Sequence, residues 1–119
     1  MKNRIICVLA IVFIGCILYV LCVPSNESKI LELEAKIAEL EEANESNELF
    51  IKSWQSQYDR AKEMYDSVMS LSNPDRDQAN YAKESMNEAT KEINALTREI
   101  DLNNLAIENY KKEIQKLKE

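Results

Sequence analysis

The chain of 119 residues contains no histidine and only one glycine, Gly15, and these two absences exclude many kinds of chemistry. Its three cysteines, Cys7, Cys16 and Cys22, all lie near the start, so the remainder cannot form a zinc ribbon or a disulfide scaffold. A single glycine cannot build a phosphate-binding loop, and no histidine is present to activate a nucleophile. We therefore expect no enzymatic activity, no metal or other cofactor and no small-molecule substrate.

Charged residues are absent from one long segment near the N-terminus. All 21 acidic residues lie at Glu27 or later, whereas two of the 15 basic residues, Lys2 and Arg4, precede the uncharged segment. The part of the chain from Pro24 onward therefore has a formal charge of 13 − 21 = −8. Because an acidic surface repels phosphates, we do not expect a nucleic-acid partner.

The uncharged segment runs from Ile5 to Val23 and contains 19 residues, among them Phe13 and Tyr19. A helix of that length, at about 1.5 Å per residue, roughly crosses a ~30 Å hydrocarbon core. The sequence therefore predicts a transmembrane anchor over residues 5–23, preceded by a short basic tail over residues 1–4. Basic tails stay in the cytoplasm, so the acidic part is expected outside the cell membrane.

Two of the cysteines support alternatives to a simple anchor. Gly15-Cys16 resembles the end of a bacterial lipoprotein signal, and Cys7 is a candidate for palmitoylation near the cytoplasmic face. A cleaved secretory signal is a further alternative. The apolar run continues past Cys16 and contains no small-residue cleavage motif, which favours an uncleaved anchor.

After a short linker over residues 24–28, apolar residues recur in alternating steps of three and four, with heptad position a at Ile30 and at Ala79. Of the 24 a and d positions, which we call the seam, three are polar, and all three are asparagine. A seam of this length is typical of a coiled coil. The first half of the seam is Ile30, Leu33, Ile37, Leu40, Asn44, Asn47, Ile51, Trp54, Tyr58, Ala61, Tyr65 and Val68. The second half is Ala79, Ala82, Met86, Ala89, Ile93, Leu96, Ile100, Asn103, Ile107, Tyr110, Ile114 and Leu117.

A break separates the two halves, and it predicts a turn over residues 72–75. Pro74 has no N–H and disfavours helical geometry at Asn73. We expect the first helix to end near Leu71 and the second to begin near Pro74, with Asn73 as its N-cap.

The predicted fold class is all-α: one transmembrane helix followed by an antiparallel coiled-coil hairpin over residues 29–119. If the chain turns back at its midpoint, facing seam residues have numbers that sum to 147. Small residues then face large ones, as in Tyr65–Ala82, and two asparagines, Asn44 and Asn103, face each other. Lys36 is expected near Glu113. The alternative is a long, kinked, parallel coiled coil.

A second apolar feature lies off the seam, at Leu49, Phe50, Leu102 and Leu105. We interpret it as a partner patch for a second copy or another helical protein. The layout of basic tail, anchor and coiled coil resembles that of phage inner-membrane spanins and of some bacterial division-scaffold proteins. The expected function is a membrane-anchored structural or interaction protein; the alternative is a lipoprotein or secreted helical binding module.

Overall fold

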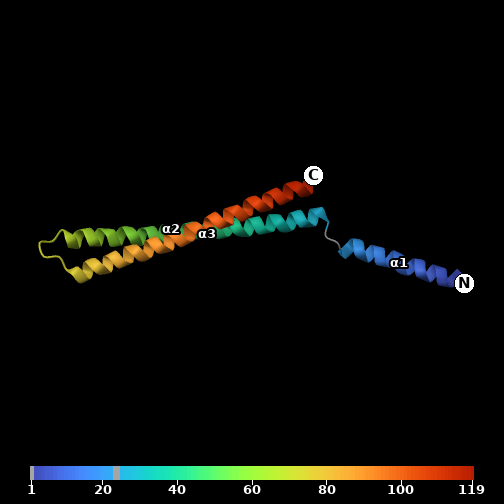
Figure 1. Cartoon of the computed structure of the whole chain (residues 1–119), viewed down its shortest axis with the longest axis horizontal. Coiled ribbons are helices and arrows are strands. Elements are labelled where there is room, and N and C mark those ends of the chain that lie inside the picture. The colour runs from blue at the N-terminus through green and yellow to red at the C-terminus, as the bar shows by residue number, and fades with distance from the viewer. Residues whose placement is uncertain (1, 23–24) are drawn as a thin grey trace.

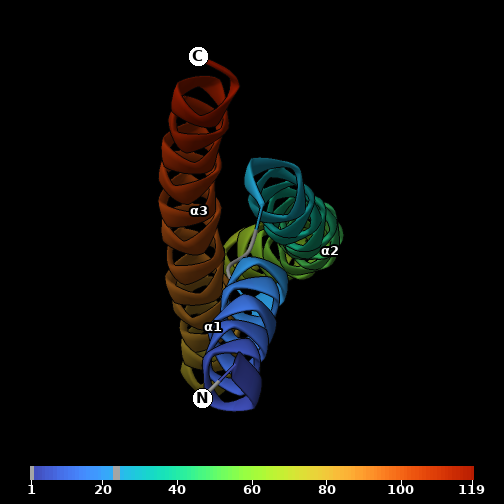
Figure 2. The same ribbon diagram turned by 90° about the vertical axis from the view of Figure 1, so that its right-hand side faces the viewer.

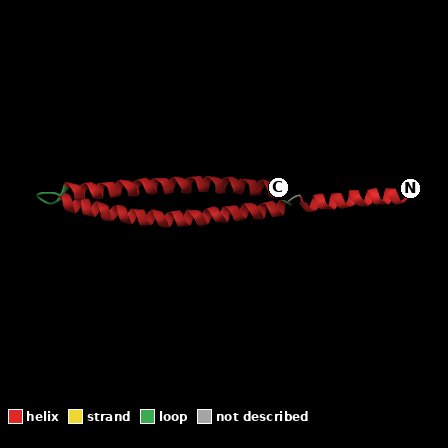
Figure 3. Cartoon of the chain, turned by 90° about the horizontal axis from the view of Figure 1, so that it is seen from below, coloured by secondary structure: helices red, strands yellow, loops and turns green. Residues whose placement is uncertain are grey.

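The computed structural model describes the backbone of residues 2–22 and 25–119 and the side chains of residues 3–18 and 25–119. The described residues form three helices: α1 (Lys2–Cys22), α2 (Asn26–Met69) and α3 (Arg76–Lys118). The molecule is elongated, with extents of 107 × 27 × 14 Å (Figures 1 and 3). The all-α prediction is confirmed.

The second and third helices form a hairpin. Figure 1 shows α2 and α3 running in opposite directions from a loop at one end of the molecule, and they cross with a small angle between them. The C-terminus lies beside the start of α2, and α1 extends away from that end. Figure 2, turned by 90°, looks along the molecule and shows α1 nearest the viewer, in front of α2 and α3. In the described part of the chain, α2 packs against α3, and α1 packs against neither.

The predicted seam forms the contact between α2 and α3. All 24 seam residues are buried or half-buried, and every fully buried residue of the described chain belongs to the seam. The core is thin, because Ala82 and Ala89 alone among the described buried residues reach 0% exposure and no larger side chain is completely covered. Two helices can cover only part of each seam side chain.

The facing pairs follow the predicted register. Leu33, Ile37, Ile107 and Ile114 form one cluster, and the half-buried residues packed against it are Ile30, Leu40, Tyr110 and Leu117. These eight residues make up four facing pairs, and the two residue numbers of each pair sum to 147.

The asparagine pair supports the same register. Asn103 Nδ2 donates to Asn44 Oδ1 at 2.9 Å, and Asn44 Nδ2 in turn donates to Asn104 Oδ1 at 2.9 Å. A seam polar pair of this kind holds one alignment of two helices, because a shifted alignment leaves each amide against an apolar side chain. The chain therefore folds back on itself, and it is not the kinked rod that we gave as the alternative.

The turn differs in detail from the sequence prediction. The α2 helix ends at Met69 and α3 begins at Arg76, so Asn73 and Pro74 both lie between the helices. The prediction that Asn73 caps α3 was wrong, because Asp75 is the N-cap. Asp75 Oδ1 accepts hydrogen bonds from the backbone N–H groups of Asp77 at 3.0 Å and Gln78 at 3.3 Å. The Asp75 carboxylate also interacts favourably with the positive end of the helix dipole.

The start of α2 is also fixed by a cap. Ser25 Oγ accepts a hydrogen bond from the N–H of Ser28 at 3.2 Å, and the helix begins at Asn26. Its first turn therefore takes in most of the segment that we expected to be a linker.

Lys36 and Glu113 line one groove, as expected, but no ion pair joins them within the described residues. Lys36 Nζ instead lies 3.7 Å from Glu32 Oε1 on its own helix and 5.8 Å from the centre of the Tyr110 ring. An i,i+4 pair needs less ordering of long side chains than a pair between helices, and the ring face also attracts the ammonium group.

Candidate interaction surfaces

The α1 helix presents apolar side chains all round. Ile5 is 62% exposed and Phe13 67% exposed, and every side chain described between residues 3 and 18 is exposed. The other two predicted anchor positions, Tyr19 and Val23, have side chains outside the described residues. Within the part of the chain that the structure describes, no helix combines the length and the apolar content needed to cross a membrane.

Two cysteines of α1 are described, and both carry free, exposed thiols: Cys7 and Cys16. The side chain of Cys22 lies outside the described residues. An exposed thiol is accessible to a modifying enzyme, but accessibility alone does not select lipid attachment over a free thiol.

The four residues of the predicted partner patch are all exposed, by between 57% and 63%. They do not share one face. Leu49 and Leu105 occupy heptad position f, which lies opposite the seam, so they face outward on opposite sides of the hairpin. Phe50 at position g and Leu102 at position c lie on one side.

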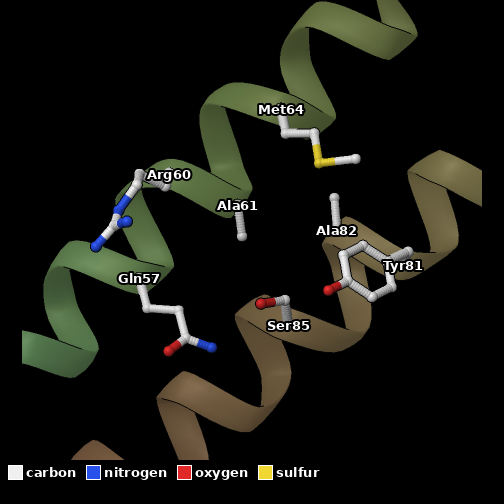
Figure 4. A pocket seen from close by; sticks show the side chains of 7 residues that line it. All are labelled: Gln57, Arg60, Ala61, Met64, Tyr81, Ala82 and Ser85. Atoms are coloured by element: carbon white, nitrogen blue, oxygen red, sulfur yellow. The ribbon is translucent and has the colours of Figure 1, made fainter.

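We call that side the c/g face, because it carries heptad positions c and g of both helices, and we call the opposite side the b/e face. A groove of about 290 Å³ opens on the c/g face near the turn (Figure 4). Its floor contains the small residues Ala61 and Ala82, and Met64 and Tyr81 stand at its sides. The seam alanines therefore leave space that a neighbouring side chain can enter.

A second groove, of about 560 Å³, lies on the same face at the other end of the hairpin. It has charged sides, because Lys29, Lys36 and Glu113 line it beside Leu117. Both grooves lie on the c/g face, whereas a smaller one lined by Gln55, Thr90 and Asn94 lies on the b/e face.

Sequence reasoning missed the residues that shape the first groove. Met64 and Tyr81 are both exposed, yet neither entered the predicted patch. Their heptad letters, g for Met64 and c for Tyr81, place them on the side of Phe50 and Leu102. Grouping the exposed apolar residues by side of the hairpin, with f positions left out, would have found this face.

One seam residue is a poor fit to the hairpin. Asn47 is buried, and its Nδ2 is the one buried side-chain polar atom without a hydrogen-bond partner among the described residues. An unpaired buried amide destabilises a fold by about 1–3 kcal/mol.

The described residues contain no group of three or more acidic, cysteine or histidine side chains able to hold a metal ion. The comparisons with known proteins give no further guide: no protein-family model, curated protein or solved structure matches the chain significantly.

Proposed function

We propose that this chain is a non-catalytic, single-pass membrane protein that presents a helical hairpin outside the membrane for self-association or partner binding. The observation that carries the proposal is the uncharged segment over residues 5–23, followed by two helices whose apolar residues repeat along one seam. No cofactor, nucleic acid or small-molecule substrate enters this role.

The exposure of α1 supports the anchor. Ten large apolar side chains between Ile5 and Leu18 are exposed and have no packing partner in the hairpin. A contiguous apolar surface of this kind needs a cover, and lipid covers a helix from every side. The uncharged run continues to Val23, five residues beyond the last described side chain of α1.

The charge distribution supports the orientation. Lys2 and Arg4 precede the uncharged segment, and the net charge of −8 follows it. The N-terminal tail is therefore proposed to stay in the cytoplasm, with the hairpin on the other side of the membrane. The turn at Asn73 and Pro74 would then be the point farthest from the bilayer.

Alkaline extraction of membranes from cells that express the full chain tests the anchor. We expect the protein to stay in the membrane pellet. Ile14 lies at the centre of residues 5–23, and Ile14→Arg should move a large fraction of the protein to the supernatant, because arginine there costs about 2.5–3.5 kcal/mol of insertion free energy. Release of the unmodified chain by alkali would contradict the anchor.

Leu49→Arg is the matched control, because it places the same charge at an exposed apolar position of α2. It should leave the protein in the pellet. The intact mass separates the anchor from the lipoprotein alternative: a start at Met1 or Lys2 supports the anchor, and an acylated start at Cys16 identifies a lipoprotein.

A further inference from the structure

The two faces of the hairpin differ in charge over the second part of α2. Between residues 43 and 69, the eight c and g positions include one charged residue, Arg60. The eight b and e positions of the same stretch include six. A stretch with so little charge on one side is typical of a surface that packs against another protein.

The thin core points to the same side. No side chain larger than alanine is completely buried among the described residues, and Phe50 and Met64 on the c/g face remain exposed. A second pair of helices on this face would cover them and thicken the core into that of a four-helix bundle.

We propose that a second copy of this chain packs on the c/g face, with both turns pointing the same way. A twofold axis parallel to the hairpin then relates the copies, and α2 of each lies against α3 of the other. The parallel direction rests on the proposed function, because two chains anchored in one membrane project from it together. The contact is isologous, as in most homodimers.

The register of this contact follows from the hairpin itself. The twofold axis keeps every residue at its height, so α2 meets the partner's α3 in the alignment that it has with its own α3. The residue numbers of facing seam pairs sum to 147. The c positions that lie closest in height therefore have numbers that sum to 148. Six such pairs connect α2 to the partner's α3.

The charges of these pairs are complementary. Arg60 faces Glu88 of the partner subunit, and Glu32 faces Lys116 of the partner subunit. None of the six pairs joins like charges. Within the described residues of one chain, Arg60 and Glu88 take part in no ion pair, so both are free to bind across the contact.

Two of the six pairs are complementary in size as well. Ser46 faces Leu102 of the partner subunit, and Ser67 faces Tyr81 of the partner subunit. A small residue against a large one keeps the separation of two helices even along their length. The exposed Leu102 and Tyr81 would thereby each gain a cover.

The b/e face lacks this complementarity. If the second copy packed on the b/e face instead, facing b positions would have numbers that sum to 146. Glu45 would then face Asp101 of the partner subunit. Its six pairs include no pair of opposite charges. A second copy is therefore favoured on the c/g face alone.

Two charge reversals, made in separate full-length chains, test the contact. Arg60→Glu brings two glutamates together at each of the two symmetric sites of the homodimer, and Glu88→Arg brings two arginines together there. Each variant alone should show a dimer Kd raised roughly 10–100-fold. When the two variants are mixed, they should form a heterodimer whose Kd is close to that of the wild-type dimer. In the heterodimer both sites join a glutamate to an arginine.

The heterodimer contains one site of each kind. At one site the introduced glutamate of the first variant faces the introduced arginine of the second, and at the other site the native Glu88 faces the native Arg60 of the partner subunit. Both sites therefore join opposite charges. A contact within one chain cannot produce this preference, since residues 60 and 88 carry like charges in both variants.

Native mass spectrometry of the chains in mild detergent, each with a tag of different mass, measures these species. Asp59→Lys is the matched control on the b/e face and should leave the homodimer Kd unchanged.

A monomeric wild-type chain, an Arg60→Glu homodimer of unchanged Kd, or a mixture without heterodimer preference would each overturn the proposal. Circular dichroism of each variant shows whether the hairpin is folded, and a variant that unfolds is replaced by the milder Arg60→Gln. Alkaline extraction of each variant reads the anchor separately, so a failed anchor and a failed dimer are distinguished.

Discussion

Replacing Ile107 with alanine is expected to lower the free energy of unfolding of the hairpin by about 2–4 kcal/mol. Ile107 lies in the best-packed part of the core, beside Leu33, Ile37 and Ile114, and it is 7% exposed. Alanine removes three carbon atoms from this cluster, and the flanking helices cannot close the space without breaking the register of their neighbours. Chemical denaturation of the full chain, followed by circular dichroism, measures the change.

Leu31→Ala is the control for this variant, because it truncates an apolar residue of α2 that is exposed rather than packed. Its free energy of unfolding should change by less than about 0.5 kcal/mol. Equal losses from the two truncations would show that the seam does not hold the helices together.

A leucine in place of Ala89 is expected to destabilise the hairpin by about 1–3 kcal/mol, since it overpacks the seam. Ala89 is 0% exposed, and the sum of 147 places it against Tyr58, a large half-buried residue. Separating the helices to admit leucine would strain the neighbouring pairs. Ala82 is equally buried but lines the groove near the turn, so leucine there has room to lean aside and should cost less.

The same denaturation measurement, applied to Ala38→Leu, provides the comparison. Ala38 is an exposed alanine of α2, where the added carbon atoms meet solvent. A stability gain from leucine at position 89 would contradict the close approach of α2 and α3, because it would mean that the seam contains unfilled space.

The hairpin could be predicted from the sequence because one pattern determines most of it. The seam residues, the turn between them and the facing pair Asn44–Asn103 all follow from a heptad count and one proline. The ends of the helices could not be placed as well. Asn73 and Asp75 are both good capping residues, and the choice between them depends on the local backbone, which the periodic pattern does not describe.

The surface was less predictable than the core. The predicted patch grouped Leu49 and Leu105 with Phe50 and Leu102 because they lie at a similar height, but the helix geometry places them on different sides. The partner of an exposed charge was also not predicted, because Lys36 lies beside both Glu32 and Glu113 and pairs with Glu32 on its own helix. Weak surface interactions of this kind do not determine a single arrangement, so a sequence does not reveal them.

The most direct test of the account is a zero-length carbodiimide crosslink between native Lys36 and Glu113, which line one groove of the hairpin. A sample with equal amounts of light and heavy isotope-labelled chains is mixed, treated and read by mass spectrometry. In a kinked rod the two residues would lie about 115 Å apart along one chain, at about 1.5 Å per residue. The account predicts crosslinked peptides that are mainly all-light or all-heavy. Absence of the crosslink, or a statistical half of mixed peptides, would contradict a chain that folds back on itself.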